Sequence, residues 1–433
     1  MRGRTQVSDH ELLSRIQKRA SALSPLALHK RYYSVSGTPG PHSKIGIKPN
    51  HTKGQSLATD VDGGAPADGL TKANKPSFGN SIGLDIQAKD RGYVGTVKIG
   101  TPARNFRLLM DSGSADLWVG GEGCIAPDDG DCGNHNFLGP KTSSSFRDTN
   151  QTWSIEYGTG AVSGHVVTDN ISIASLKLKS FKFGVAREET EDFTPDYIPF
   201  DGLAGLAKSM ISQQGTITLV EALHKAGHIK DAITSYKIPR LADGKNDGEM
   251  TLGAMNPAKY NSKTLVTVPN VNPLGFWEAI IDGVKINGKD MGWKNRTAIL
   301  DTGTTLIIAP EPDVAAIHKH IPGAYYDGNS WTVPCNTKAA ISFTFGKREY
   351  SIDARDIPWL PIDPSLPKGN CSSGFSIGSI GADDQWLVRF EFTFSRMPLI
   401  RDISMKVGDI FLKNVYMSTD VGKNQITFAK LAK

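Results

Sequence analysis

The chain carries the same short motif twice, and this repetition constrains its fold more than any other feature. LLMDSGS occupies residues 108–114 and AILDTGTT occupies residues 298–305, so Asp111 and Asp301 lie 190 positions apart. In each copy an apolar run typical of a buried strand ends at an aspartate, followed by a hydroxyl residue, a glycine and another hydroxyl residue. An isolated carboxylate at the end of such a strand is costly to bury. The repeat therefore indicates two duplicated lobes, each of which supplies one aspartate to a shared site.

Two carboxylates held close together support one particular chemistry. They cannot both ionise easily, so they share a proton and titrate as a pair. One can accept a proton from water while the other protonates a substrate carbonyl, which permits amide hydrolysis without a covalent intermediate. We expect Gly113 and Gly303 to let backbone amides approach the carboxylates. We expect the hydroxyls of Ser114 and Thr304 to bind the outer carboxylate oxygens.

The distribution of residue types favours an all-β protein preceded by a basic segment. From Ile82 onward, short runs rich in Val, Ile, Thr, Tyr and Phe alternate with Gly, Asn and Asp. Helical patterns are confined to residues 216–226 and 311–320. Residues 1–80 hold 12 Lys and Arg against 5 Asp and Glu, whereas the remainder holds 37 against 39. The basic excess thus argues against a nucleic-acid surface on the body of the protein. No apolar run approaches the ~20 residues of a membrane helix.

The cysteines favour an oxidising compartment, but the N-terminal residues do not have the pattern of a secretory signal peptide. Cys124 and Cys132 lie close together in one half, and Cys335 and Cys371 lie in the other. We predict two disulfides, 124–132 and 335–371, against the alternative of four buried thiols. Asn-x-Ser/Thr acceptor sites for glycosylation occur at Asn50, Asn150, Asn170, Asn295 and Asn370. Residues 1–20 lack the apolar core of a signal peptide, so either the chain is intracellular or its true start is missing.

Several segments, in order, resemble the pepsin family of aspartic proteases. Residues 93–120 are similar to the first strands and first catalytic loop, and residues 154–164 to the flap hairpin. Residues 200–207 resemble the apolar-Gly segment that supports the first aspartate, and residues 298–306 resemble the second catalytic loop. The resemblance covers the chain from about Ile82 to its end. It implies an all-β, bilobal fold in which two pseudo-twofold-related β lobes enclose a cleft.

The resemblance also implies roles for individual residues. Asp111 and Asp301 would be the catalytic pair, and Tyr157, beside Gly158 and Thr159, would be the flap tyrosine that accepts a hydrogen bond from Trp118. Some fungal-type members have an acidic residue at the position of Thr159 and accept Lys before the cleaved bond. Thr159 removes that attraction for Lys, and the resemblance implies cleavage between bulky apolar residues. Ser112 replaces the threonine common in the family and keeps its hydroxyl. Both cysteine pairs fall where the family has disulfides.

The resulting expectation is a monomeric aspartic endopeptidase, active in acid, secreted or vacuolar, and made as a zymogen. Residues 1–76 would form a basic prosegment, 77–258 the N-terminal lobe and 259–433 the C-terminal lobe. Polypeptides would be the substrates, with no metal or organic cofactor, no nucleic acid and no membrane as partner.

Residues 388–406 interrupt the match near the C-terminus. Joining Leu387 to Val407 would give WLVGDIFLKNVY, which resembles the family segment that supports the second aspartate. The 19 intervening residues place Lys406 two positions before Gly408, where an unpaired buried charge would be expensive. We interpret this segment as a retained intron; the alternative is a genuine surface loop.

Three other functions have partial support in the sequence. GFSIG, residues 374–378, matches the Gly-x-Ser-x-Gly motif of serine hydrolases, but no histidine follows Ser376. We interpret it as strand and turn. His224 and His228 are spaced like metal ligands on a helix, but without the His-Glu-x-x-His arrangement surface histidines are the better interpretation. A catalytically impaired binding protein with this fold is the serious alternative, if residues 388–406 disrupt the C-terminal lobe.

Overall fold

The computed structural model describes residues 69–127, 130–158, 160–363, 365–378 and 404–432. All of them belong to the compact unit Gly63–Lys433. Strands dominate this unit, which confirms the all-β class. The α-helices of the described residues include the two that the sequence predicts. They are α3 (Leu219–Lys225), α4 (Glu311–His318) and α5 (Asp409–Leu412), accompanied by short 3₁₀ turns at Ser209–Ile211, Leu241–Asp243, Ser262–Thr264 and Ala354–Asp356.

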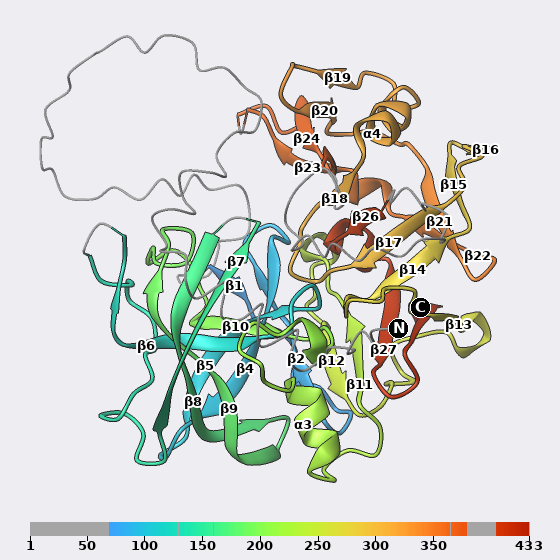
Figure 1. Cartoon of the computed structure of the whole chain (residues 1–433). Helices are drawn as coiled ribbons and strands as arrows, with labels where there is room; N and C mark the ends of the chain where they lie inside the picture. Colours follow the sequence, from blue (N-terminus) through green and yellow to red (C-terminus); the bar gives the residue numbers. More distant parts are fainter. Residues whose placement is uncertain (1–68, 128–129, 159, 364, 379–403, 433) are drawn as a thin grey trace, which may run out of the picture. The chain divides into compact units, whose positions relative to one another are not determined.

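The first half of the chain builds a nine-stranded sheet, drawn in blue to green in Figure 1. Its strands, in spatial order, are β1 (Leu70–Thr71), β3 (Asp85–Gln87), β4 (Gly92–Ile99), β5 (Arg104–Asp111), β10 (Gly202–Gly205), β6 (Leu117–Ile125), β9 (Leu176–Glu189), β8 (Gly160–Ile173) and β7 (Arg147–Tyr157). Along β5, Phe106, Leu108 and Met110 alternate into the core, as period-two patterning requires. The strand β10 runs parallel to β5 and supports the end of it.

A six-stranded sheet combines strands from both halves of the sequence. Its order is β13 (Val266–Pro269), β28 (Gln425–Lys430), β27 (Val415–Asp420), β11 (Ile233–Lys237), β12 (Glu249–Leu252) and β2 (Ser81–Gly83). β27 pairs with β11 at its centre, so the last part of the chain lies against residues about halfway along it. Three strands therefore come from each side of the boundary expected between residues 258 and 259.

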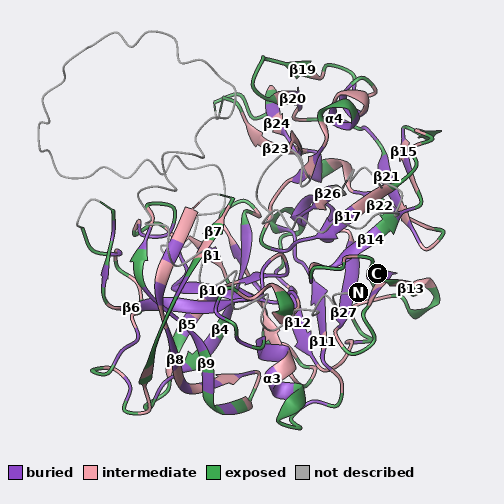
Figure 2. Ribbon diagram, in the orientation of Figure 1, coloured by how far each residue is buried: buried purple, intermediate pink, exposed green. Residues whose placement is uncertain are grey.

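Three smaller sheets form the rest of the second half, in yellow to orange in Figure 1 except for the red strand β26. The central one contains β14 (Glu278–Ile281), β17 (Arg296–Leu300), β26 (Ser404–Val407), β18 (Ile307–Ala309) and β25 (Phe375–Ile377). A second contains β16 (Lys289–Asp290), β15 (Gly283–Ile286), β21 (Ile341–Phe345) and β22 (Arg348–Ile352), and a third contains β19 (Tyr325–Tyr326), β20 (Trp331–Pro334), β24 (Asn370–Ser373) and β23 (Pro358–Pro361). The buried residues follow the inner strands of both halves (Figure 2).

The central sheet repeats the arrangement around β5. β26 runs parallel to β17 and antiparallel to β18, as β10 runs parallel to β5 and antiparallel to β6. The two copies of the sequence motif thus end equivalent strands. Residues 404–406 of the interrupting segment belong to β26, whereas residues 388–403 lie outside the described residues.

Candidate active site

The two aspartates end equivalent strands and are almost completely buried. Asp111 is the last residue of β5 and is 5% exposed; Asp301 directly follows β17 and is 1% exposed. Each is held against the supporting strand of its own lobe. Asp111 lies opposite Gly205 of β10, and the Asp301 backbone N–H donates to the carbonyl of Val407 at 3.2 Å.

The two loops interlock through the hydroxyl residues that follow the aspartates. Ser112 Oγ donates to the Leu300 carbonyl at 2.8 Å, and Thr302 Oγ1 donates to the Met110 carbonyl at 2.7 Å. Each of these hydroxyl oxygens also accepts the backbone N–H of the other residue at 3.0 Å. Ser112 therefore makes all the bonds of this exchange despite lacking the threonine methyl. Four hydrogen bonds across the junction fix the two loops relative to each other.

Within each loop, the carboxylate is oriented by the residues that follow it. The glycine two positions on donates its backbone N–H to Oδ1, and the next hydroxyl donates to Oδ2. The bonds are Gly113 to Asp111 at 2.7 Å, Ser114 to Asp111 at 2.5 Å, Gly303 to Asp301 at 2.8 Å and Thr304 to Asp301 at 2.7 Å. The two glycines also permit a close approach, since a Cβ on either would collide with the carboxylate of the opposite loop. The structure thus brings Asp111, Gly113, Ser114, Asp301, Gly303 and Thr304 together.

The surroundings of the two carboxyls shift their pKa values in opposite directions. Burial and the neighbouring Asp301 charge raise the pKa of Asp111 to about 7. Burial would also raise the pKa of Asp301, but the Lys406 ammonium and hydrogen bonds from Asp111 and Thr304 hold it at about 2. Two carboxyls this close are expected to share one proton, and the direction of the two shifts makes Asp111 the weaker acid of the pair.

Lys406 is the member of the site that sequence reasoning did not assign. Its Nζ lies 2.5 Å from Asp301 Oδ2. The expectation of an unpaired charge in this strand is therefore wrong, because Asp301 neutralises it. The internal repeat could have revealed the contact, since aligning the two lobes places Lys406 in the supporting strand beside the second aspartate.

The flap hairpin, formed by β7 and β8 around Tyr157, carries the predicted tyrosine. Trp118 Nε1 donates to the Tyr157 hydroxyl at 2.7 Å. Phe193 packs edge-on against both rings, with centroid distances of 5.4 Å to Trp118 and 5.7 Å to Tyr157. Phe193 had no recognisable sequence signal. Gly158 is exposed at the turn, and Thr159 lies outside the described residues.

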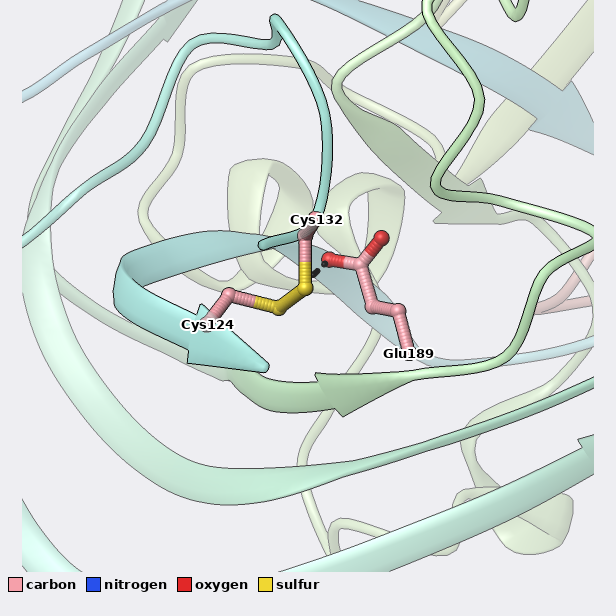
Figure 3. A group of neighbouring side chains, drawn as sticks. All are labelled: Cys124, Cys132 and Glu189. Carbon is pink, nitrogen blue, oxygen red and sulfur yellow. Dashed lines mark hydrogen bonds between the residues drawn. A yellow bond between two sulfur atoms is a disulfide. The ribbon is translucent and has the colours of Figure 1, made fainter. Parts of the chain in front are cut away.

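Both predicted disulfides are present, 124–132 and 335–371. Cys124 and Cys132 lie beside the buried Glu189 carboxyl, and these three side chains form a group of potential metal ligands (Figure 3). Because the sulfurs are bonded to each other, they offer no thiolates to a cation. Burial, assisted by Asp201, raises the pKa of Glu189 to about 8.

Two further buried acids were not singled out from the sequence. Asp116 accepts hydrogen bonds from Ser212 Oγ and from the backbone N–H groups of Gln213 and Gln214, so it anchors that loop. Asp409, at the start of α5, is 1% exposed and neither of its carboxyl oxygens has a hydrogen-bond partner. Burial raises its pKa well above the usual range, although Lys413 opposes the shift.

The competing motifs do not form sites among the described residues. Ser376 lies within strand β25 rather than at a strand-to-helix elbow, as the strand interpretation expects. His224 and His228 are exposed. No helix of the described residues is long and apolar enough to cross a membrane.

Comparison with known proteins accounts for this arrangement. Residues 92–431 match the family described as eukaryotic aspartyl protease. The chain belongs to this family. It is 32% identical over 358 residues to the "Probable aspartic-type endopeptidase CTSD" of Arthroderma benhamiae, covering 82% of this chain and 64% of that protein. It is 29% identical to the "Aspartic-type endopeptidase ctsD" of Aspergillus fumigatus (82% and 69%) and 29% identical to Pepsin A of Bos taurus (79% and 85%). The chain thus spans less than two thirds of the length of the first of these relatives.

Proposed function

We propose that this protein is an aspartic endopeptidase that hydrolyses polypeptides in acid, preferably between bulky hydrophobic residues. The observation that carries the proposal is the geometry of the carboxyl pair, Asp111 and Asp301, whose two loops are joined by four hydrogen bonds. The names of the fungal and mammalian relatives support the same activity. Apolar preference rests on the resemblance and on Thr159 alone.

The proposed mechanism assigns different tasks to the two acids. Asp301, as the carboxylate, accepts a proton from a water that attacks the scissile carbonyl carbon. Asp111 donates its proton to the carbonyl oxygen, so the tetrahedral intermediate is a neutral diol. Asp301 then gives its proton to the amide nitrogen, the C–N bond breaks, and Asp111 takes a proton from a hydroxyl of the diol, so the pair again holds one proton. Tyr157, oriented by Trp118, closes over the bound peptide and limits access of bulk water.

We also propose that the basic N-terminal segment is removed on activation. Residues 1–68 lie outside the described residues, whereas Leu70 is fully buried and pairs with Gln87 in the nine-stranded sheet. Cleavage is therefore expected before Gly69, because loss of Leu70 would open the core. Two disulfides favour a secreted or vacuolar location, and a monomer remains our expectation.

A peptide-binding protein without activity is the second candidate, favoured by the Lys406–Asp301 ion pair. One experiment separates the two functions. The full chain is acidified, assayed on denatured globin with and without a statine-type peptide, and its new N-terminus is sequenced. Acid turnover that the statine peptide blocks, with a start before Gly69, is the expected result. Tight statine binding without any turnover would favour the binding protein, and neither binding nor turnover would reject both.

Gly303→Ala is expected to lower kcat/KM at least about 100-fold, because its Cβ would displace the Asp111 carboxylate from the pair. Gly79→Ala is the matched control, since a Cβ there meets open space and the backbone is not left-handed. Steady-state kinetics of both folded variants tests this. Unchanged kcat/KM in Gly303→Ala would contradict the close approach of the two loops.

A further inference from the structure

Lys406 occupies a position that is apolar in the other lobe. It lies opposite Ile299 of β17 and Ile308 of β18. The equivalent residue of β10 is Leu203, opposite Leu109 of β5 and Trp118 of β6. Leu203 is 3% exposed and packs in the core beside the flap tyrosine. The pseudo-twofold relation of the lobes therefore breaks at this residue, next to the carboxyl pair.

The lysine side chain is directed at the second aspartate. Its Nζ contacts the same Asp301 oxygen, Oδ2, that accepts the Thr304 hydroxyl. The Lys406 side chain is 30% exposed and the Asp301 side chain only 2% exposed, so a partly exposed lysine reaches a buried carboxylate. A direct ammonium contact of this length is a strong, charge-assisted bond.

Among the described ionisable groups around the pair, Asp301 makes the ion pair with this lysine. Asp111 of β5 faces it across the site and shares its attraction. Asp409 of α5 interacts with the pair only through space, and burial raises its pKa well above the usual range. The Lys413 ammonium, one helical turn on, contacts Asp90 and Asp356 instead. Within the described residues, Lys406 is the cation that contacts the pair.

We propose that Lys406 is a resident counter-ion that attenuates the hydrolysis proposed above by occupying the outer oxygen of Asp301. The inference rests on that proposed function. The ammonium competes with water and substrate for hydrogen bonds to Asp301. It also makes Asp301 a weak base, since a carboxylate whose pKa lies far below the working pH accepts a proton poorly. The low pKa of Asp301 and the raised pKa of Lys406 agree with this description.

Lys406 belongs to the segment 388–406, so a chain without this segment would lack the cation. If residues 388–406 were absent, Leu387 would directly precede Val407. A leucine would then stand at the register position of Lys406, as Leu203 does in the other lobe. The presence or absence of these residues would therefore select between an attenuated and an active form.

The test compares the full chain with its Lys406→Leu variant over pH 2–8 on one apolar peptide. The variant should raise kcat/KM at least about tenfold near pH 4. Both limbs of its pH profile should move to higher pH, because loss of the ammonium raises the pKa of both acids. Lys285→Leu is the control: it removes an exposed lysine that pairs with Glu349 at 2.7 Å in the same lobe, and should change neither quantity.

A second readout keeps the result interpretable. The dissociation constant of a statine-type peptide should fall at least tenfold in Lys406→Leu, and likewise in the chain that lacks residues 388–406, which serves if the point variant does not fold. The inference would be overturned if the full chain and both variants had the same kcat/KM, the same pH profile and the same dissociation constant for the statine-type peptide. The proposed function would remain intact in that case. If no form hydrolyses peptide, the proposed function fails, and the binding comparison alone decides: tighter binding without Lys406 supports the counter-ion and equal binding overturns it.

Discussion

Asp111→Asn is expected to reduce kcat at least about 10³-fold, because the asparagine cannot donate the proton that the substrate carbonyl requires. The side chain keeps its shape, so Gly113 N–H can still donate to the amide oxygen, and the Ser114 hydroxyl, which donates to Oδ2 in the wild type, can instead accept from the amide NH2 group. The Asp301–Lys406 contact is also untouched. Thermal unfolding should therefore change little, and single-turnover kinetics with a statine-binding control will separate lost chemistry from lost structure.

Asp301→Asn should show a different combination of effects. Turnover is again lost, but Lys406 is left without its carboxylate, which should lower the free energy of unfolding by about 1–3 kcal/mol. Asp327→Asn, in an exposed turn, is a matched control for both variants. Residual turnover above about one tenth of wild type in either active-site variant would contradict the proposed roles. Equal stability of the two variants would contradict the importance of the ion pair.

The protein is expected to lose stability steeply as the pH rises from 5 to 9. Burial raises the pKa of Asp111 to about 7 and that of Glu189 to about 8, and raises that of Asp409 well above its usual range. Each group keeps its proton in the folded state at pH values where the unfolded chain has released it. Its stabilising contribution is therefore complete below about pH 4 and is lost as the pH rises through the folded pKa. Since one retained proton is worth about 1.4 kcal/mol per pH unit, the three groups together predict a loss of several kcal/mol.

Urea unfolding at intervals between pH 5 and 9 measures this slope. Asp409→Asn and Glu189→Gln should each make it shallower, because neutral amides have no proton to release. Asp327→Asn should leave it unchanged, since that exposed carboxyl has a lowered pKa. A flat stability profile in the wild-type protein would show that these carboxyls ionise freely in the folded state.

Much of the fold could be predicted because local patterns agree with tertiary structure. The apolar runs before both aspartates, the two short helices and both disulfides follow from residue type and spacing. The two loops that carry the aspartates could be predicted because a glycine flanked by two hydroxyl residues, directly after a buried aspartate, suits few structures besides a carboxylate held by backbone and hydroxyl donors. Such agreement across levels is what a foldable sequence requires.

What could not be predicted depends on neighbours distant in the sequence. Nothing in the sequence near Asp409 or Glu189 indicates that their carboxyls become buried. Phe193 gives no signal of its contact with the flap tyrosine. The partner of Lys406 was missed because only the free-energy cost of burying a charge in a central strand was considered. Asp301 lies more than 100 positions away, so the local sequence does not indicate the ion pair.

The shared six-stranded sheet has a consequence for how the chain folds during synthesis. Ile233 pairs with Asp420 and Tyr236 with Met417, so β11 obtains its central neighbour only from a strand that is synthesised much later. The nine-stranded sheet can form while translation continues, but the strands β11, β12 and β2 must wait with one edge exposed. Pairings of such large sequence separation form slowly, and an open sheet edge invites aggregation. Proteins of this architecture should therefore depend on chaperones most strongly until β27 has been synthesised and has paired with β11.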